Sequence, residues 1–322
     1  MIKENPYRKY TGAPLREFNP DAGLDAYIPS DGLKKAVEIA RLLQRPLLLR
    51  GEPGSGKTRL AEALAYELYG DKYRDYYFEW HIKSTTKARD GLYTFDHLGR
   101  LHDVQAFKKK KITKYRRFGP LGAAFRKSTP ETPAIVLIDE IDKADIDFPN
   151  DLLRELEQQR FDIPETGEAG QEKGIRAAYP PIVIITSNDE KELPNAFLRR
   201  CIFHYLEFPG EDTLVDIAKQ KLRSLPNNQQ LEEDIVRGLV RKFEAKHKEM
   251  RHDPNVDKVP STSELLDWLQ VVAFYAFHKD PESQNKIRID EDRIVFDDGS
   301  ELPYPGVILK SFDDYRRTVG EI

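Results

Sequence analysis

The sequence predicts an α/β protein, in which helices cover a parallel β-sheet and a helical subdomain follows. Between residues 32 and 209, short apolar segments alternate with segments of helical periodicity, the order typical of parallel strands joined by helices. A glycine-rich turn, residues 51–56, joins an apolar segment to a helical one. After Phe208-Pro209-Gly210 the long segments are amphipathic helices separated by Pro, Asn and Asp turns.

The 322-residue chain is expected to contain four regions. They are an N-terminal segment, an α/β core, a helical subdomain and a C-terminal tail, over residues 1–31, 32–209, 210–280 and 281–322. Strands of the core are expected over residues 46–50, 76–82, 134–139, 181–187 and 202–207, and helices of the subdomain over 211–225, 228–251 and 261–278. In the tail, period-two alternation predicts a hairpin that opposes Ile287 and Ile289 to Ile294 and Phe296.

Composition restricts the function classes. Charged residues make up 33% of the chain but the net charge is only −4, so the whole molecule has no positive field for nucleic acid or an anionic membrane. The single cysteine, Cys201, cannot form an intrachain disulfide, and the seven histidines show no zinc-site spacing. The N-terminus is polar and no apolar run is long enough to span a bilayer. We therefore expect a cytoplasmic protein with no membrane contact.

Residues 51–58, Gly-Glu-Pro-Gly-Ser-Gly-Lys-Thr, satisfy the phosphate-binding pattern GxxxxGK[ST] between an expected strand and an expected helix. Backbone N–H groups of such a turn, together with the helix N-terminus, bind polyphosphates. Lys57 is expected to reach the β- and γ-phosphates and Thr58 to ligate Mg²⁺. The sequence therefore predicts ATP and Mg²⁺ as cofactors. The nucleotide-contacting residues that we assign are Gly51, Glu52, Pro53, Gly54, Ser55, Gly56, Lys57, Thr58 and Leu60.

Two adjacent carboxylates, Asp139 and Glu140, follow the apolar segment 134–138. A metal-bound triphosphate needs one carboxylate to hold the Mg²⁺ hydration shell and another to activate the attacking water. Asp139 fits the first role and Glu140 the second. Asn188 ends a later apolar segment and would stand beside the γ-phosphate, because ligands of open parallel sheets bind at the carboxyl ends of the strands.

The order of these motifs resembles that of the AAA+ ATPases, and the residues within and around the motifs resemble those of the MoxR-like branch. The shared segments are residues 50–58, 138–144, 186–188 and 196–200, and the resemblance covers roughly residues 25–280. It implies a phosphate-loop AAA+ core with a C-terminal helical lid. It also implies two insertions, an extra segment within the second helix region at about 89–118 and a hairpin before the Asn188 strand at about 161–179. In related proteins such elements face a central channel or the substrate.

By position, the resemblance makes residues 51–58 the Walker A loop, Asp139 and Glu140 the Walker B pair, and Asn188 the first sensor. One departure concerns the lid helix. Ser263 stands where the resemblance would place the Arg of a second sensor, and Ser261 with Glu264 forms a plain capping box.

An arginine finger is implied at Arg199 or Arg200, and we favour Arg200 because it directly precedes the next strand. The alternative is a solvated basic turn. An Arg at a subunit edge can reach a neighbour's γ-phosphate only if subunits pack in a ring. We therefore expect a homo-oligomeric ring, with a hexamer as the expected size.

The first insertion carries the one strongly basic segment: Lys108 to Lys111, Lys114, Arg116 and Arg117. Tyr115 and Phe118 are interleaved with these charges, so the segment could touch nucleic acid. A solvated face is the more frequent reading of a charge run in a loop. Nucleic acid is therefore not an expected partner.

Two functions remain open. The preferred one is a chaperone-like ATPase motor that remodels or assembles a protein client, and the resemblance implies a partner with a von Willebrand factor A domain. The alternative is the motor or switch of a nucleic-acid machine of the restriction or defence type, for which GTP is a further candidate nucleotide. Stimulation by a co-encoded protein rather than by DNA would separate them.

Overall fold

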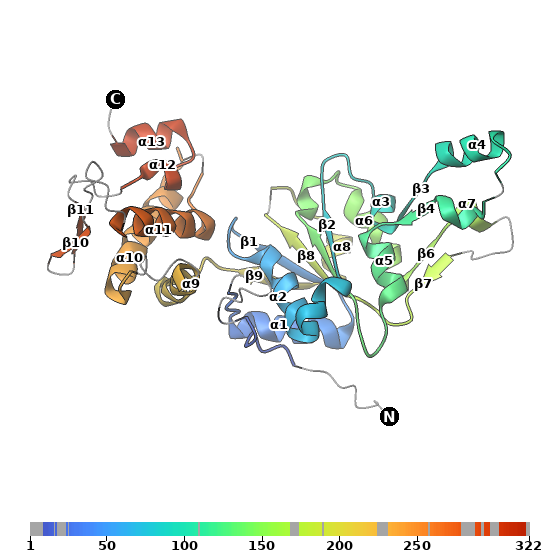
Figure 1. Cartoon of the computed structure of the whole chain (residues 1–322), viewed down its shortest axis with the longest axis horizontal. Coiled ribbons are helices and arrows are strands. Elements are labelled where there is room, and N and C mark those ends of the chain that lie inside the picture. Colours follow the sequence, from blue (N-terminus) through green and yellow to red (C-terminus); the bar gives the residue numbers. More distant parts are fainter. Residues whose placement is uncertain are drawn as a thin grey trace. The chain divides into compact units, whose positions relative to one another are not determined.

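In the computed structural model the chain forms two compact units (Figure 1). The first contains the chain up to Pro14, Pro29–Gly51 and Gly56–Leu206, and the second contains Leu15–Ile28, Glu52–Ser55 and Glu207–Ile322. The structure describes residues 9–15, 17, 24, 26–108, 110–167, 174–188, 190–223, 231–256, 258–277, 287–290, 293–296 and 303–319.

The first unit is built on a five-stranded parallel sheet with strand order β2-β5-β8-β1-β9. The strands are β1 (Leu47–Gly51), β2 (Tyr77–His81), β5 (Ile135–Asp139), β8 (Ile182–Ser187) and β9 (Ile202–Leu206). All five predicted strands and the parallel sheet are confirmed. Because the strands are parallel, their carboxyl ends share one edge of the sheet.

Helices flank this sheet (Figure 1). They are α1 (Asp31–Leu43), α2 (Lys57–Tyr69), α5 (Pro120–Lys127), α6 (Phe148–Gln158) and α8 (Asn195–Leu198), with 3₁₀ turns η1 (Gly70–Asp75) and η3 (Ile141–Lys143). Local chemistry sets their starts. The Ser30 hydroxyl accepts the N–H of Leu33 at 3.2 Å and caps α1, and Pro120 occupies the first position of α5.

One face of the sheet forms the main core of this unit. Alternate residues of the central strands, among them Val136, Ile138 and Ile185, are 0% exposed and pack with Phe125 and Leu152 of the flanking helices. The period of two follows from strand geometry. Burial of each such side chain is worth about 1.5–3 kcal/mol, so this face fixes the strand register and, with it, the positions of the strand ends.

Both expected insertions are present. In the first, α3 (Ala88–Leu92) leads to β3 (Tyr93–Phe95), α4 (His97–Gln105), η2 (Ile112–Tyr115) and β4 (Arg116–Phe118), and β3 pairs antiparallel with β4. In the second, β6 (Arg160–Asp162) pairs antiparallel with β7 (Gly174–Arg176), with α7 (Pro164–Gly167) between them. The hairpin expected in the second insertion is thus confirmed.

The second unit is mainly helical. It contains α9 (Glu211–Arg223), α10 (Glu233–His252), α11 (Thr262–Phe277), α12 (Pro305–Ile308), α13 (Phe312–Val319), β10 (Ile287–Asp290) and β11 (Arg293–Phe296). Its core gathers buried side chains from α9, α10 and α11, including Leu214, Phe243 and Trp268. The three predicted helices are confirmed, although α10 begins at Glu233 rather than at residue 228, which lies outside the described residues.

Two smaller expectations about the second unit are also confirmed. The hairpin pairs Ile287 with Phe296 and Ile289 with Ile294. At the start of α11, the Ser261 N–H donates to the Glu264 carboxylate at 3.0 Å, as a capping box requires. Among the described residues, no helix is long and apolar enough to cross a membrane.

Candidate nucleotide-binding site

Two glycines of the first unit, Gly51 and Gly56, stand at the two ends of residues 52–55 of the phosphate-binding loop. Gly51 closes β1 at φ 152°, and a Cβ there would lie 2.3 Å from the Leu206 carbonyl oxygen, so a larger residue does not fit. Gly56 precedes α2 at φ 88°, a left-handed conformation that glycine adopts without steric cost. The first N–H groups of α2 have no partner within the helix and can meet an anion.

The side chains of the loop suit a polyphosphate. Lys57 is only 6% exposed, and its ammonium donates to the Gly51 carbonyl at 2.7 Å. The hydroxyl of Ser55 is buried without a hydrogen-bond partner among the described residues. Leu60, which was assigned to the same site, is fully buried within α2. An ammonium and an unpaired hydroxyl are groups that phosphate oxygens can satisfy.

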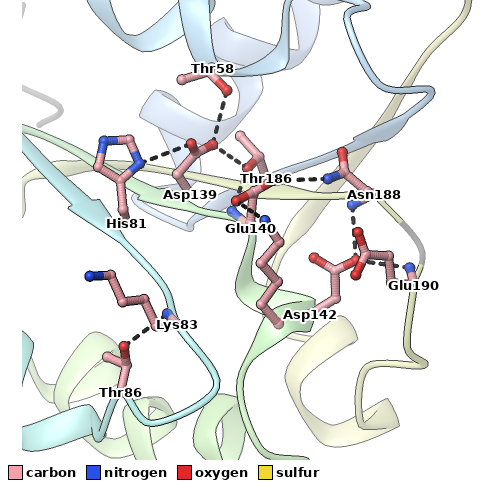
Figure 2. Close-up of polar contacts among 11 residues, drawn as sticks. Thr58, His81, Lys83, Thr86, Asp139, Glu140, Asp142, Thr186, Asn188 and Glu190 are labelled. Carbon is pink, nitrogen blue, oxygen red and sulfur yellow. Dashed lines mark hydrogen bonds and ion pairs between the residues drawn. The ribbon is translucent and has the colours of Figure 1, made fainter. Parts of the chain in front are cut away.

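Asp139 is the centre of the polar network at the carboxyl edge of the sheet (Figure 2). Its Oδ1 accepts the Thr58 hydroxyl at 3.0 Å and the Thr186 hydroxyl at 2.6 Å. Its Oδ2 lies 3.2 Å from Nδ1 of His81, the residue opposite Asp139 in the sheet register. The structure therefore brings together Thr58 and Asp139, the two predicted metal ligands.

This pair fits a magnesium ion that is shared with a nucleotide. A hydroxyl and a carboxylate supply hard oxygen ligands, and Mg²⁺ in such sites takes one or two protein ligands, waters and phosphate oxygens. In the described part of the chain, no group of three or more His, Cys, Asp or Glu residues could hold a metal by itself. The site thus suits a metal–nucleotide complex rather than a metal enclosed by protein.

Glu140 follows Asp139 in a left-handed conformation, φ 58°, which turns its side chain away from the strand direction. Its Oε1 accepts the Asn188 amide at 3.2 Å and its Oε2 accepts the Lys143 ammonium (Figure 2). The hydrogen bond with Glu140 raises the pKa of Lys143, which therefore stays charged. Two predicted site residues, Glu140 and Asn188, are hydrogen-bonded to each other.

An open hollow of about 540 Å³ lies beside Glu140. Its polar lining includes His81, Lys83, Lys143 and Lys191. Cationic groups around a carboxylate can bind the charge of a phosphate group while the carboxylate orients water. This arrangement is compatible with attack of water on a terminal phosphate.

Sequence reasoning missed several residues that hold these groups. Thr186 accepts the Glu140 N–H at 2.8 Å, in addition to its bond with Asp139. Asp142 accepts the N–H groups of Asn188 at 3.0 Å and Glu190 at 2.9 Å. Thr186 lies two residues before Asn188 at the end of the same strand, and this position could have indicated a role in the site. For Asp142 the sequence offers no such indication except that it lies two residues after Glu140.

The two candidate arginines lie at the end of α8. Arg200 donates from Nε to Glu157 of α6 and from Nη1 to the Ala196 carbonyl at 2.9 Å. Arg199 is exposed. Among the described residues, no contact joins either arginine to Asp139 or Glu140 of the same chain. Their assignment as a finger therefore stays a prediction that concerns a neighbouring subunit.

In the second unit, residues 52–55 contact α10 and α11. Glu52 pairs with Arg251 at 2.7 Å and lies 3.6 Å from Nε2 of His247. A Cβ on Gly54, whose φ is 73°, would lie 2.4 Å from Cβ of Ser261. From the sequence, a lid arginine was considered only at the position of Ser263. The pairing of Arg251 of α10 with Glu52 was not predicted.

Parts of this chain are similar to known proteins. Residues 46–201 match the model of the AAA domain (dynein-related subfamily). A stretch of 49 residues is 47% identical to the replication factor C small subunit of Saccharolobus solfataricus, and covers 15% of this chain and 14% of that protein. Among solved structures, NtrX from Brucella abortus in complex with ATP is similar over 80% of this chain and 54% of its own, at 14% identity and a TM-score of 0.46.

The matched segment includes the loop at residues 51–58, the carboxylates Asp139 and Glu140, and Asn188. It also spans four strands of the central sheet, β1, β2, β5 and β8. Residues 46–201 of the first unit are thus similar to the AAA domain, and the unit has a five-stranded parallel sheet with a phosphate-binding loop after β1.

Proposed function

We propose that this protein hydrolyses ATP with Mg²⁺ and couples hydrolysis to the remodelling or assembly of a protein partner. We further propose that it acts as a homo-oligomeric ring of the MoxR-like branch, with six subunits as the expected size and a von Willebrand factor A domain in the partner. The AAA domain over residues 46–201 supports the nucleotide chemistry. The two insertions of the first unit support a protein partner.

The observation that carries the proposal is the hydrogen-bonded network of the two adjacent carboxylates. Asp139 shares a hydrogen bond with Thr58, and Glu140 shares one with Asn188. When bound, Mg²⁺ neutralises phosphate charge and orients the triphosphate. Lys57 binds the phosphates, Thr58 and Asp139 hold the metal, Asn188 orients the terminal phosphate, and Glu140 accepts a proton from water. Glu140 becomes available for that step when Lys143 transfers its hydrogen bonds to phosphate.

Two substitutions test the proposal because they act on different steps. Lys57→Ala removes a ground-state contact with phosphate, so we expect nucleotide affinity to fall at least about tenfold. Glu140→Gln removes the proton acceptor, so we expect binding to persist while turnover falls about a hundredfold or more. Nucleotide titration and steady-state phosphate release, each with ATP and with GTP, measure the two effects.

Exposed residues of the same type provide matched controls. Lys72→Ala and Glu131→Gln replace exposed side chains of the same unit and should leave both measurements unchanged. Equal affinity of Lys57→Ala and wild type for ATP would exclude the assigned site. Stimulation of hydrolysis by DNA rather than by a co-encoded protein would favour the nucleic-acid machine.

A further inference from the structure

Helix α4 exposes its apolar side and buries its acidic residue. Leu98, Leu101 and Val104 are 80%, 55% and 61% exposed, whereas Asp103 is 8% exposed. The three apolar residues are spaced by three, so they lie along one side of the helix. Phe107 follows at 93% exposure. A surface helix normally shows the opposite arrangement, because apolar side chains gain free energy by leaving water.

Specific contacts hold α4 in this orientation. Asp103 accepts the Tyr115 hydroxyl at 3.1 Å and the Lys110 ammonium at 2.6 Å. Tyr115 is itself buried, with its ring 6.3 Å from that of Phe95. At the other end, the Asp96 carboxylate caps α4 by accepting the Gly99 N–H at 2.7 Å. The apolar stripe, Leu98, Leu101, Val104 and Phe107, is therefore held outward by polar contacts on the opposite side.

The stripe stands on a body made from both insertions. Glu165 of α7 accepts the Tyr93 hydroxyl at 2.9 Å and also binds the Arg89 guanidinium. The ring of Tyr93 stacks on that of Phe161 with centroids 6.0 Å apart. Figure 1 shows α4, β3 and β4 beside α7, β6 and β7 in the first unit. We name this body, residues 88–118 with the described part of 160–176, the inserted head.

The segment that carries the apolar stripe is rich in basic residues. Between His97 and Phe118 the only acidic residue is the buried Asp103. Among the described residues, Lys108 and Lys110 lie 3.9 and 2.6 Å from the Asp103 carboxylate. The other exposed basic residues of this segment that the structure describes are Arg100, Lys111, Lys114 and Arg117. A partner that covers the stripe would place its own flanking groups against these cations, and electrostatic complementarity then selects carboxylates.

The exposed chemistry fits a protein better than a nucleic acid. Base stacking needs available aromatic faces, but Tyr115 is buried. Phe118 lies between the guanidinium groups of Arg116 and Arg126, each 4.4 Å from its ring centroid. The apolar side chains that α4 exposes are aliphatic, so Phe107 is the one exposed aromatic side chain of the stripe. A membrane is also disfavoured, because membrane affinity scales with apolar area and α4 has nine residues.

We propose that the apolar stripe is the docking site for a protein segment that presents leucine- or phenylalanine-like side chains flanked by Asp and Glu. This segment would belong to the partner of the proposed function, so the inference rests on that function and specifies the chemistry of the partner. Protein interfaces usually have apolar anchor residues in the centre and charged residues at the rim. The anchors supply most of the affinity, and the charges set the orientation.

Selection from a random peptide library displayed on phage tests the chemistry directly. The full chain is immobilised, and selected peptides are sequenced and then synthesised. We expect enrichment of peptides that combine Leu or Phe with Asp or Glu. The triple variant Leu98→Ser/Leu101→Ser/Val104→Ser should bind the synthesised peptides at least about tenfold more weakly. The double variant Leu42→Ser/Leu43→Ser, at leucines of α1 that are 74% and 52% exposed, should bind normally.

Charge reversal provides a second, independent readout. Lys111→Glu/Lys114→Glu should lose the acidic peptides and enrich basic ones, since both lysines are exposed. The proposal is overturned if no peptide is enriched, or if the triple variant binds the selected peptides as well as wild type does. It is also overturned if the triple variant instead loses binding to a single-stranded DNA oligonucleotide, to phosphatidylserine vesicles, or to a second copy of the chain.

Basal ATP hydrolysis keeps the two proposals distinguishable. None of the substituted residues belongs to the loop at 51–58 or to the carboxylate network, so each variant should hydrolyse ATP as wild type does. If peptides are selected but the chain has no ATPase activity, the proposed function is contradicted and the docking site is supported. If the chain hydrolyses ATP but no peptide is enriched, the docking site is contradicted and the proposed function is not.

Discussion

Asp142 acts on the site through backbone groups of a neighbouring strand end. It is 2% exposed, and its Oδ2 accepts the N–H groups of Asn188 and Glu190 just beyond β8. These bonds fix the chain direction there, and with it the Asn188 amide that meets Glu140 at 3.2 Å (Figure 2). Asp142 is thus a positioning residue for the Asn188–Glu140 pair.

Replacement of Asp142 by Asn should reduce turnover more than nucleotide binding. The charge-assisted bonds to two N–H groups weaken, so the Asn188 amide loses its orientation. We expect kcat to fall about tenfold, since small misplacements in an active site are costly. KM for ATP should stay near the wild-type value, because the hydrogen bonds of Asp142 go to Asn188 and Glu190 rather than to the phosphate-binding loop. Steady-state ATP hydrolysis measures both. The control Asp145→Asn, at an exposed position, should change neither kcat nor KM. A normal kcat for Asp142→Asn would contradict the positioning role of Asp142.

Sequence could predict the residues that stand at strand ends but not those that support them. Asp139, Glu140 and Asn188 each follow an apolar segment, and the carboxyl ends of parallel strands share one edge. His81 meets Asp139 only because β2 pairs with β5 in a register that places them opposite each other. That register depends on core packing across segments that are far apart in sequence, so no local pattern indicated His81.

The inserted head is the element in which prediction was least complete. A hairpin was expected only in the second insertion, where β6 pairs with β7, and the β3–β4 pair of the first insertion was not predicted. Helix α4 was not predicted. Apolar periodicity indicates a helix that buries one side in a core, and α4 leaves its apolar side exposed. The contact between the insertions could not be predicted either: Arg89 and Glu165 are separated by 76 residues, and charged residues have many candidate partners.

Glu165 should stabilise the inserted head in a pH-dependent way. Burial alone would raise the pKa of Glu165, but hydrogen bonds from the backbone, Tyr93 and Arg89 outweigh burial and lower it. A lowered pKa in the folded state means that the stabilisation is fully present above the unfolded value of about 4.3 and is lost as pH falls through the folded value. Glu165→Gln should therefore cost about 1 kcal/mol of stability at neutral pH, a value limited by the half-exposed Arg89.

Thermal unfolding measured at pH 7 and again below pH 4 tests this expectation. The gap between Glu165→Gln and wild type should narrow at acid pH, where wild-type Glu165 also becomes neutral. The exposed-site variant Glu131→Gln should show no gap at either pH. A gap of constant size would mean that shape rather than charge accounts for the contribution of Glu165.

The chain combines a first unit that is similar to the AAA domain over residues 46–201 with a helical second unit. The proposed ring requires that subunits complete one another's sites. Within one chain, Arg200 binds Glu157 and the Ala196 carbonyl, and its side chain is 41% exposed. A guanidinium held at the surface by one exposed carboxylate can exchange that partner for a phosphate, because exposed ion pairs are weak. The assignment of Arg200 to a neighbour's nucleotide follows from this exposure together with the need for cationic charge at the γ-phosphate.

Arg200→Ala should bind ATP nearly normally and hydrolyse it about a thousandfold more slowly, since a finger supplied by a neighbour stabilises the transition state and adds little to ground-state binding. Mixing Arg200→Ala with Glu140→Gln subunits should restore part of the activity. Some interfaces then combine the intact Glu140 of one subunit with the intact Arg200 of its neighbour. Arg154→Ala, at a side chain that is 70% exposed on α6, should remain fully active. Mixtures without recovery, or specific activity that is unchanged by dilution to monomer, would exclude Arg200 as the finger and make Arg199 the next residue to test.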